Sequence, residues 1–381
     1  MTHSLVERRQ LFAEARRILI KIGSAVLTHE KGLNRVILHR LTDQIADLRG
    51  QGKEVVLVSS GAISCGVRKA GLSARPSSIP GKQAAAALGQ VTLMRAWEEA
   101  FDCFDLQVAQ ILLTGEDLNH RHRYLNARYT LETLLSWGVV PIINENDTVM
   151  VDEIKFGDND QLGTTIAGLL GADLVVLLSD IDGLYTKDPR KFDDAVLIPF
   201  VDSIEEEHLA GATQSSSGLG TGGMKSKLMA AAKCMKAGIP MLIAPGRQRD
   251  VLLELAAGKE VGTLFWTQKR APRSKKLWLQ HLPNPAGELH LDTGATQALR
   301  SGGSSLLPIG ITGVIGDFNV GDALRCLSPE GEVIGIGLTN YSAEDVRRIA
   351  GHHSEKINTL LGYQHAEEVI HRDHFALSES L

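Results

Sequence analysis

The sequence predicts an α/β protein with a mostly parallel central sheet sandwiched by helices, followed by a small C-terminal β-rich domain. Short continuous runs of Val, Ile and Leu alternate with longer helical patterns over the first 270 residues. Continuous apolar runs are typical of strands buried on both faces, and their alternation with helices favours a parallel sheet. From about residue 283, short strand-like pieces separated by glycine-containing turns predict the second domain.

Six apolar runs are the predicted strands of the first domain, at 17–23, 54–60, 106–113, 139–144, 173–180 and 240–244. Five stretches with helical spacing lie between or after them, at 35–52, 82–101, 126–138, 158–172 and 225–238. The helix at 35–52 ends in glycine, a common C-terminal cap. In the second domain, strand-like pieces occupy 287–292, 304–314, 322–328 and 332–338.

Composition changes define the expected domain boundaries. Residues 1–16 carry acids and bases together and predict a short amphipathic helix that extends the N-terminus. We expect the first domain at 17–268, a basic proline-containing linker at 269–282, the second domain at 283–365 and a tail at 366–381.

Bulk composition excludes several classes of protein. The formal charge of the 381 residues is −5, which does not indicate a nucleic-acid or anionic-membrane partner. The four cysteines are far apart and form no C-x-x-C pair, so a zinc site or a disulfide framework is not expected. Without a signal-peptide pattern or a spanning apolar run, we expect a soluble cytoplasmic protein.

The glycine-rich segment SSSGLGTGGMKSK at 215–227 suggests phosphate binding but matches neither common phosphate-loop pattern. The dinucleotide motif requires a preceding strand and a later acid, and both are missing. The nucleotide P-loop requires lysine where Met224 stands. The segment still favours binding of an anion, through its glycine N–H groups, the start of a helix, and the charges of Lys225 and Lys227. A flexible surface loop is the alternative.

Polar residues follow three predicted strands where the strands end. Lys21 lies in an otherwise apolar strand, and Ser59 and Ser60 end the next one. The stretch INENDTVMVDEIKFGDNDQL at 143–162 mixes Asn, Asp and Glu directly after a buried strand. Ligands bind at the carboxyl ends of parallel strands, where such acids can hold an ammonium group, orient lysines or bind Mg²⁺. A solvated acidic loop and an ordinary Ser-Gly turn are the alternatives.

Taken together, the motifs resemble the amino acid kinase family, and most closely its members that phosphorylate the side-chain carboxylate of glutamate. The resemblance is carried, in the family's order, by K-x-G-S, VSSGAI, INENDTV, GDND, LLSDIDGLYTKDPR and SGLGTGGMKSK. It covers residues 17 to about 373. The segments SSLLPIGITGV, DALRC and RRIAGHHS are similar to the PUA domain that bacterial members carry.

The resemblance implies roles for individual residues. Lys21 and Lys227 would flank the transferred phosphoryl group, with Asp160 holding both lysines in place. Ser60, Asp147 and Asn159 would bind glutamate. The expected ATP contacts are Lys21, Ser179, Asp180, Thr221, Gly222, Gly223, Met224, Lys225, Ser226 and Lys227. The resemblance implies Mg²⁺ with ATP, and no residue is assigned as its protein ligand.

The expected reaction transfers phosphoryl from ATP to the γ-carboxylate of L-glutamate in line, with Mg²⁺ and without a covalent enzyme intermediate. A carboxylate is ionised at pH 7 and needs no general base, so the chemistry requires positioning and charge neutralisation. The resemblance also implies a homo-oligomer, proline as a feedback inhibitor and transient contact with glutamyl phosphate reductase. Kinases for N-acetylglutamate, aspartate or uridylate are the rivals within the class.

An RNA-binding protein acting through the second domain is the alternative from another class. Residues 283–381 contain six Lys and Arg against thirteen Asp and Glu, a net charge of −7. RNA-binding surfaces are normally basic, so we expect a structural or regulatory domain and no RNA partner.

Overall fold

The computed structural model describes residues 2–29, 32–149, 159–205, 223–267 and 285–378. The chain divides into two units, Met1–Ala271 and Pro272–Leu381. Each unit has its own sheet and its own hydrophobic core. The expected linker at 269–282 lies outside the described residues.

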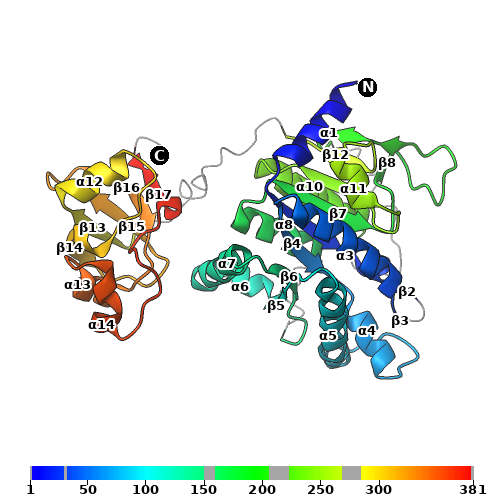
Figure 1. The fold of residues 1–381 in the computed structure, drawn as a ribbon, viewed down its shortest axis with the longest axis horizontal. Helices are drawn as coiled ribbons and strands as arrows, with labels where there is room; N and C mark the ends of the chain where they lie inside the picture. Colours follow the sequence, from blue (N-terminus) through cyan, green and yellow to red (C-terminus); the bar gives the residue numbers. More distant parts are fainter. Residues whose placement is uncertain (1, 30–31, 150–158, 206–222, 268–284, 379–381) are drawn as a thin grey trace. The chain divides into compact units, whose positions relative to one another are not determined.

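An eight-stranded sheet forms the centre of the first unit, in the order β10-β12-β11-β7-β1-β4-β6-β5 (Figure 1). Its strands are β1 (Arg17–Ile22), β4 (Glu54–Ser59), β5 (Val108–Leu113), β6 (Val140–Glu145), β7 (Leu174–Ser179), β10 (Phe200–Val201), β11 (Met241–Pro245) and β12 (Thr263–Phe265). All six predicted strands are present, and they pair in parallel. The short β12 is antiparallel to β11 and was not predicted.

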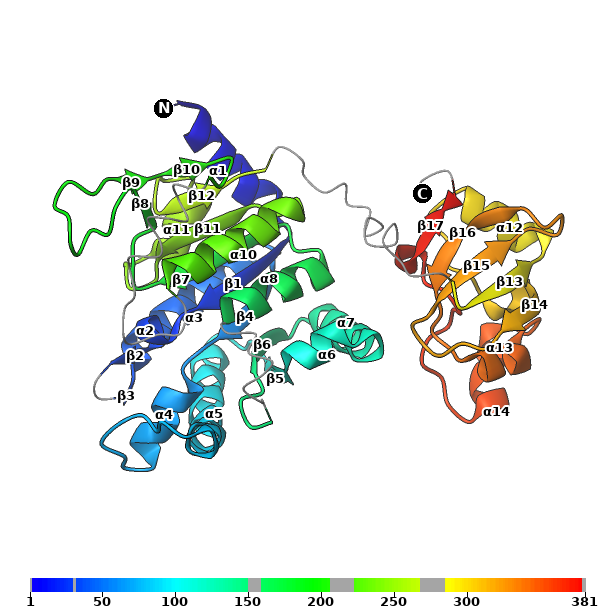
Figure 2. The same cartoon turned by 180° about the vertical axis from the view of Figure 1, so that it is seen from behind.

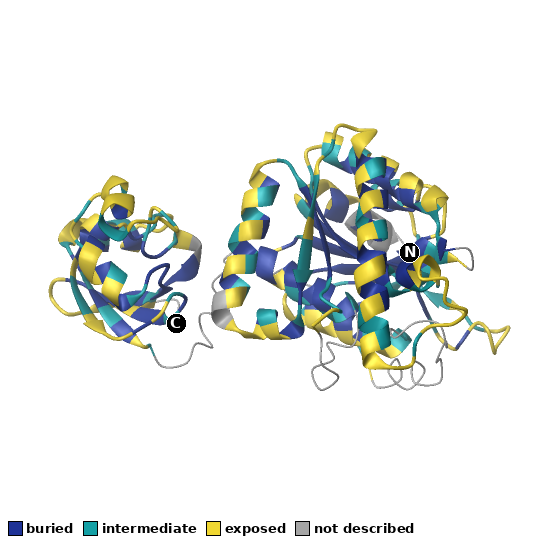
Figure 3. Cartoon of the chain, turned by 90° about the horizontal axis from the view of Figure 1, so that it is seen from below, coloured by how far each residue is buried: buried dark blue, intermediate teal, exposed yellow. Residues whose placement is uncertain are grey.

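Helices cover both faces of this sheet, as predicted. Alternate residues of β1 belong to different cores, with Ile18 and Ile20 in one and Leu19 in the other. One face carries α1 (Thr2–Glu14), α3 (Arg35–Gly50), α5 (Ile79–Asp102) and α11 (Val251–Ala256). The other face, in front in Figure 2, carries α7 (Arg121–Ser136), α8 (Asn159–Leu170) and α10 (Met224–Lys236). Figure 3 shows the buried strands between helices whose outer sides are exposed.

The remaining elements of the first unit are short apart from α4. They are α2 (Ser24–Leu27), β2 (Thr28–His29), β3 (Gly32–Leu33), α4 (Ala62–Lys69), α6 (Gly115–Asn119), β8 (Leu184–Tyr185) and β9 (Leu197–Ile198). Helices α4 and α5 approach unusually closely at two glycines. A Cβ on Gly66 would lie 1.6 Å from the carbonyl oxygen of Ala85, and one on Gly89 would lie 1.7 Å from that of Ala62.

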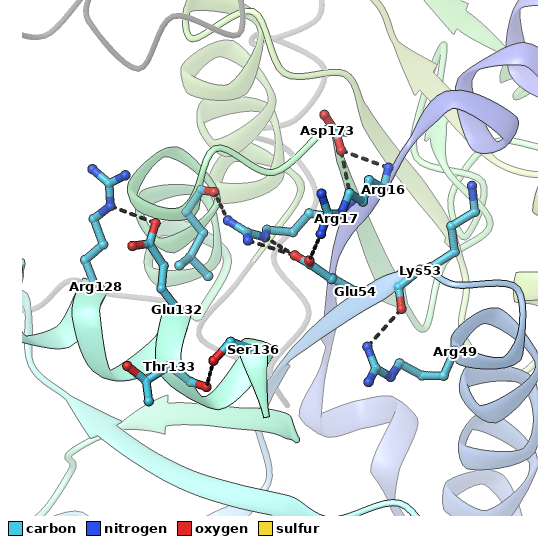
Figure 4. Close-up of polar contacts among 11 residues, drawn as sticks. Arg16, Arg17, Arg49, Lys53, Glu54, Arg128, Glu132, Thr133, Ser136 and Asp173 are labelled. Carbon is cyan, nitrogen blue, oxygen red and sulfur yellow. Dashed lines mark hydrogen bonds and ion pairs between the residues drawn. The ribbon is translucent and has the colours of Figure 1, made fainter. Parts of the chain in front are cut away.

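Charged side chains pair at the amino ends of the parallel strands (Figure 4). The carboxylate of Glu54 pairs with Arg17 at 2.7 Å and with Arg16 at 2.9 Å. Asp173 accepts hydrogen bonds from the backbone N–H groups of both arginines. These contacts fix the register of β1, β4 and β7 at the end of the sheet opposite to Lys21.

The second unit contains a five-stranded sheet in the order β14-β13-β15-β16-β17. Its strands are β13 (Gly287–Leu291), β14 (Ile311–Gly316), β15 (Ala323–Leu327), β16 (Val333–Leu338) and β17 (Phe375–Leu377). Its helices are α12 (Thr293–Arg300), α13 (Ala343–Ile349) and α14 (Ile357–Leu361), with 3₁₀ turns η3 (Pro308–Gly310), η4 (Ser354–Lys356) and η5 (Arg372–His374).

Two sequence expectations for this unit differ from the structure. The strand expected at 304–314 is interrupted by η3, because Pro308 lacks the N–H that a strand ladder uses. The expected tail, 366–381, contains β17, which pairs with β16, and Val369 and Ile370 lie in the core. The compact second unit therefore extends beyond residue 365.

Candidate functional site

Three charged residues meet at the carboxyl ends of the central strands. Lys21 of β1 and Lys227 of α10 both pair with Asp160 of α8, the second pair at 3.1 Å between Nζ and Oδ2. Their exposed fractions are 4%, 6% and 1% respectively. Two ammonium groups sharing one carboxylate leave a net charge of +1 in a buried place, which suits an anionic ligand.

Two of these charged residues lie at the N-termini of helices. Asp160 lies in the first turn of α8, where the helix dipole stabilises an acid. Lys227 lies in the first turn of α10, where the dipole disfavours a cation. The side chain of Gln161 donates to the carbonyl of Ser226 at 3.4 Å and joins the two helices. The ion pair with Asp160 at 3.1 Å therefore holds the buried ammonium group of Lys227 in a place that the helix dipole alone does not favour.

A chain of uncharged side chains runs beside this cluster. Asn159 Nδ2 donates to Ser60 Oγ at 2.6 Å and to Asn144 Oδ1 at 2.9 Å. Asn144 Nδ2 in turn donates to Gln90 Oε1 at 2.9 Å. The network links the ends of β4 and β6 to α8 and α5, so it fixes Ser60 and Asn159 relative to each other.

Asp147 lies after β6 and lines a cavity of about 200 Å³ together with residues of α5 and β5. Burial raises the pKa of Asp147 to about 6, and the positive charge of Arg75 acts in the opposite direction. A ligand ammonium group stabilises a poorly solvated carboxylate more than a well-solvated one, because water already stabilises the charge of the second.

The predicted nucleotide contacts fall into two described places. Ser179 ends β7, the neighbour of β1, and is buried, and its hydroxyl donates to the exposed Asp180 at 3.1 Å. Gly223, Met224, Lys225 and Ser226 form the start of α10 beside Lys227, and Lys225 is exposed. Thr221 and Gly222 lie outside the described residues.

The structure gives different contacts to Ser59 and Ser60, the two adjacent serines that the sequence offered as candidate hydroxyl groups. The hydroxyl of Ser59 accepts a hydrogen bond from the indole N–H of Trp97 at 2.9 Å, and the side chain is fully buried. It therefore stabilises the packing of α5 on β4, and only Ser60 joins the polar network. Sequence reasoning missed Gln90, which is 54 residues from its partner Asn144.

Comparison with known proteins decides the family. Residues 16–245 match the amino acid kinase family, which is more than half of the chain. The chain belongs to this family. Residues 287–361 match the PUA domain, in agreement with the separate β-rich unit.

Curated relatives share this organisation over nearly their whole length. A protein of Meiothermus ruber named "Glutamate 5-kinase" is 56% identical over 366 residues, which are 96% of this chain and 97% of the relative. Proteins with the same name from Thermus thermophilus and Geobacter sulfurreducens are 52% and 48% identical, covering 96% and 97% of this chain and 98% and 100% of the relatives. Among solved structures, a UMP kinase of Bacillus anthracis aligns over 67% of this chain and 97% of its own, with a TM-score of 0.47 at 15% identity.

Two further observations concern the described residues of this family member. None of its described helices is long and apolar enough to cross a membrane. Within the same residues, no three His, Cys, Asp or Glu side chains gather in a way that could hold a metal ion.

Proposed function

We propose that the protein transfers the γ-phosphoryl group of ATP to the γ-carboxylate of L-glutamate, giving L-glutamyl 5-phosphate and ADP. The buried cluster of Lys21, Asp160 and Lys227 carries this proposal, because it provides a positive charge where two anionic reactants must meet. The curated relatives support glutamate as the acceptor, and the kinase family supports ATP as the donor. An N-acetylglutamate or aspartate kinase and an RNA-binding protein are not favoured by these relatives.

The two lysines stabilise charge on the transferred group in this mechanism. In-line transfer places negative charge on the phosphoryl oxygens and on the attacking and leaving oxygens. We assign Lys21 and Lys227 to these oxygens and Asp160 to holding both ammonium groups in position. The acceptor carboxylate is already ionised, so the step needs neither a general base nor a covalent enzyme intermediate.

We assign the acceptor end of the site to Ser60, Asn159 and Asp147. Ser60 Oγ accepts from Asn159 and can still donate its own hydroxyl hydrogen to a substrate oxygen, without adding negative charge. Asn159 uses both Nδ2 hydrogens on Ser60 and Asn144, so its Oδ1 is the atom that remains for a substrate donor. Asp147 lies in the neighbouring cavity and would pair with the α-ammonium group. We assign the adenosine and phosphates to Ser179, Asp180 and the segment 221–227.

Mg²⁺ accompanies ATP in this proposal, but the described residues do not form a protein cage for it. Asp160, the buried acid of the cluster, is engaged by two lysines. Mg²⁺ usually keeps several waters and binds substrate phosphates, so it can enter with the nucleotide. The assigned protein groups act on oxygens of the two substrates directly.

We further propose a cytoplasmic homo-oligomer that proline inhibits and that transiently contacts glutamyl phosphate reductase. Proline carries the same α-carboxylate as glutamate and a positively charged α-nitrogen, so it can compete for Asp147. An acyl phosphate is readily hydrolysed, which favours direct transfer to the next enzyme.

Hydroxamate formation tests the proposed reaction. Hydroxylamine traps an acyl phosphate, so ATP-dependent hydroxamate should form with L-glutamate and far less with N-acetylglutamate or aspartate. A higher kcat/KM for either rival acceptor would overturn the substrate assignment. Failure with all three acceptors, while the protein remains folded, would overturn the reaction class.

A further inference from the structure

Helix α5 contributes one polar side chain, Gln90, to the cavity beside Asp147. Ala86 and Gln90 lie four residues apart on this helix and both face the cavity. The volume of about 200 Å³ lies below the roughly 300–1,000 Å³ typical of drug-sized ligands, so it suits a small metabolite. Much of the remaining lining is apolar, contributed by residues such as Ala62, Val91 and Leu112.

Gln90 is nine-tenths buried, and only one end of its amide has a partner. Its Oε1 accepts from Asn144, whereas its buried Nε2 has no hydrogen-bond partner. A buried amide donor without a partner destabilises the free protein, because no hydrogen bond offsets its loss of solvation. Buried polar groups of this kind are rare, and a donor beside a cavity is explained by a ligand that completes its hydrogen bonds.

We propose that Gln90 is a substrate contact, whose Nε2 donates a hydrogen bond to the α-carboxylate of the amino-acid substrate bound beside Asp147. This inference rests on the proposed function, because it adds a residue to the same acceptor site. Neither the motifs nor the family resemblance indicated this residue.

The charges of the cavity select the α-carboxylate as the partner. Two acids, Asp147 and Glu145, line the cavity, so they attract the α-ammonium group and repel any carboxylate close to them. The α-carboxylate is bonded to the same carbon as the ammonium group, so it must lie nearby and needs donors that offset this repulsion. A neutral amide donor fixed by Asn144 meets that need, and its orientation follows from the hydrogen bonds running from Asn159 through Asn144 to Gln90.

The test compares ligands that lack one group each. Glutarate keeps both carboxylates and lacks the ammonium group, whereas 4-aminobutyrate lacks the α-carboxylate. Binding of L-glutamate, glutarate and 4-aminobutyrate is measured by inhibition constants and by thermal shift for the wild-type protein and Gln90→Met. Methionine has a similar length and no donor. Gln110→Met serves as the control, because Gln110 also lines the cavity but is exposed.

Gln90→Met should weaken glutamate and glutarate about tenfold to a hundredfold, the effect expected for losing a hydrogen bond to a charged group. The change for 4-aminobutyrate should stay within about twofold, and kcat should change little. An equal loss for all three ligands would assign Gln90 to positioning Asn144 and overturn the contact. Unchanged glutamate binding would overturn it as well, whereas failure of the wild-type protein to use glutamate would instead refute the proposed function.

Discussion

Replacing Asp147 with asparagine should stabilise the free protein and weaken glutamate binding at the same time. Burial raises the pKa of the Asp147 carboxyl from its usual value of 3.8 to about 6. At 1.36 kcal/mol per pH unit, this difference means that ionised Asp147 lowers the free energy of unfolding by about 3 kcal/mol. Partial contact of the side chain with solvent reduces this effect to about 1–3 kcal/mol. Because this carboxyl pKa is raised in the folded protein, the stability that protonated Asp147 contributes is fully present below pH 3.8 and is lost as the pH rises through 6. Asparagine carries no charge, so the variant keeps its stability at pH 8.

The same substitution removes the partner of the substrate ammonium group. Loss of a charge-assisted hydrogen bond should raise the glutamate KM about tenfold to a hundredfold, with a small effect on ATP. In the wild-type protein, kcat/KM for glutamate should fall about tenfold per pH unit below pH 6, as Asp147 takes up a proton. The profile of Asp147→Asn should lack this decline.

Urea unfolding at pH 4 and pH 8, together with kinetics across the same range, measures both effects. Asp193→Asn is the control, because Asp193 is exposed on a loop of the same unit. The variant should be more stable than the wild type at pH 8 and nearly equal to it at pH 4. A less stable variant at pH 8 would refute the burial argument, and an unchanged glutamate KM would refute the ammonium assignment.

Three other substitutions test the reaction centre and the packing that supports it. Lys227→Met should lower kcat about a hundredfold to a thousandfold with a small change in glutamate KM. Lys236→Met, on an exposed lysine in the last turn of the same helix, should retain most of the activity, and a retained kcat in Lys227→Met would disprove the role. Gly89→Ala should reduce the free energy of unfolding by about 1–3 kcal/mol, because the added Cβ would lie 1.7 Å from a carbonyl oxygen of α4. Gly168→Ala is the control: there is open space around Gly168, so alanine should stabilise α8 by up to about 1 kcal/mol. Arg8→Met should lower Tm by several degrees, because the buried guanidinium donates to three backbone carbonyls that methionine leaves unpaired; equal Tm values would contradict this.

The sequence was sufficient to predict the central sheet because buried parallel strands have a strong local signal. β4 and β7 are six-residue apolar runs that each end in a serine, a pattern that can be recognised from the local sequence alone. The strands β12 and β17 have only three residues each, so their apolar content does not stand out. Their pairing depends on partners far along the chain, which a local pattern does not contain.

Most residues of the candidate site, including the uncharged Ser60 and Asn159, were already candidates in the sequence, whereas Gln90 was not. A lysine in an apolar strand is locally anomalous, so Lys21 could be identified from the sequence. Gln90 lies in an alanine-rich helical stretch where a polar residue is ordinary. Its burial depends on Gly66 and Gly89, which let α4 and α5 approach closely, and on Asn144, which fixes its amide. Similarly, Ser59 and Ser60 are equivalent in the sequence, and only the position of Trp97 distinguishes them.

The division between charged and neutral groups follows from the charges of the two substrates. ATP and the γ-carboxylate repel each other, so acids close to the reaction centre would oppose their approach. Asp160 is tolerated there because two lysines overcompensate its charge. The network from Ser60 to Gln90 supplies donors with no net charge. The half-buried acid Asp147 lies in the cavity that we assign to the α-ammonium group. Moving a carboxylate into the network, as in Asn159→Asp, should therefore reduce kcat/KM more than removing the amide in Asn159→Ala, and the reverse order would contradict this electrostatic argument.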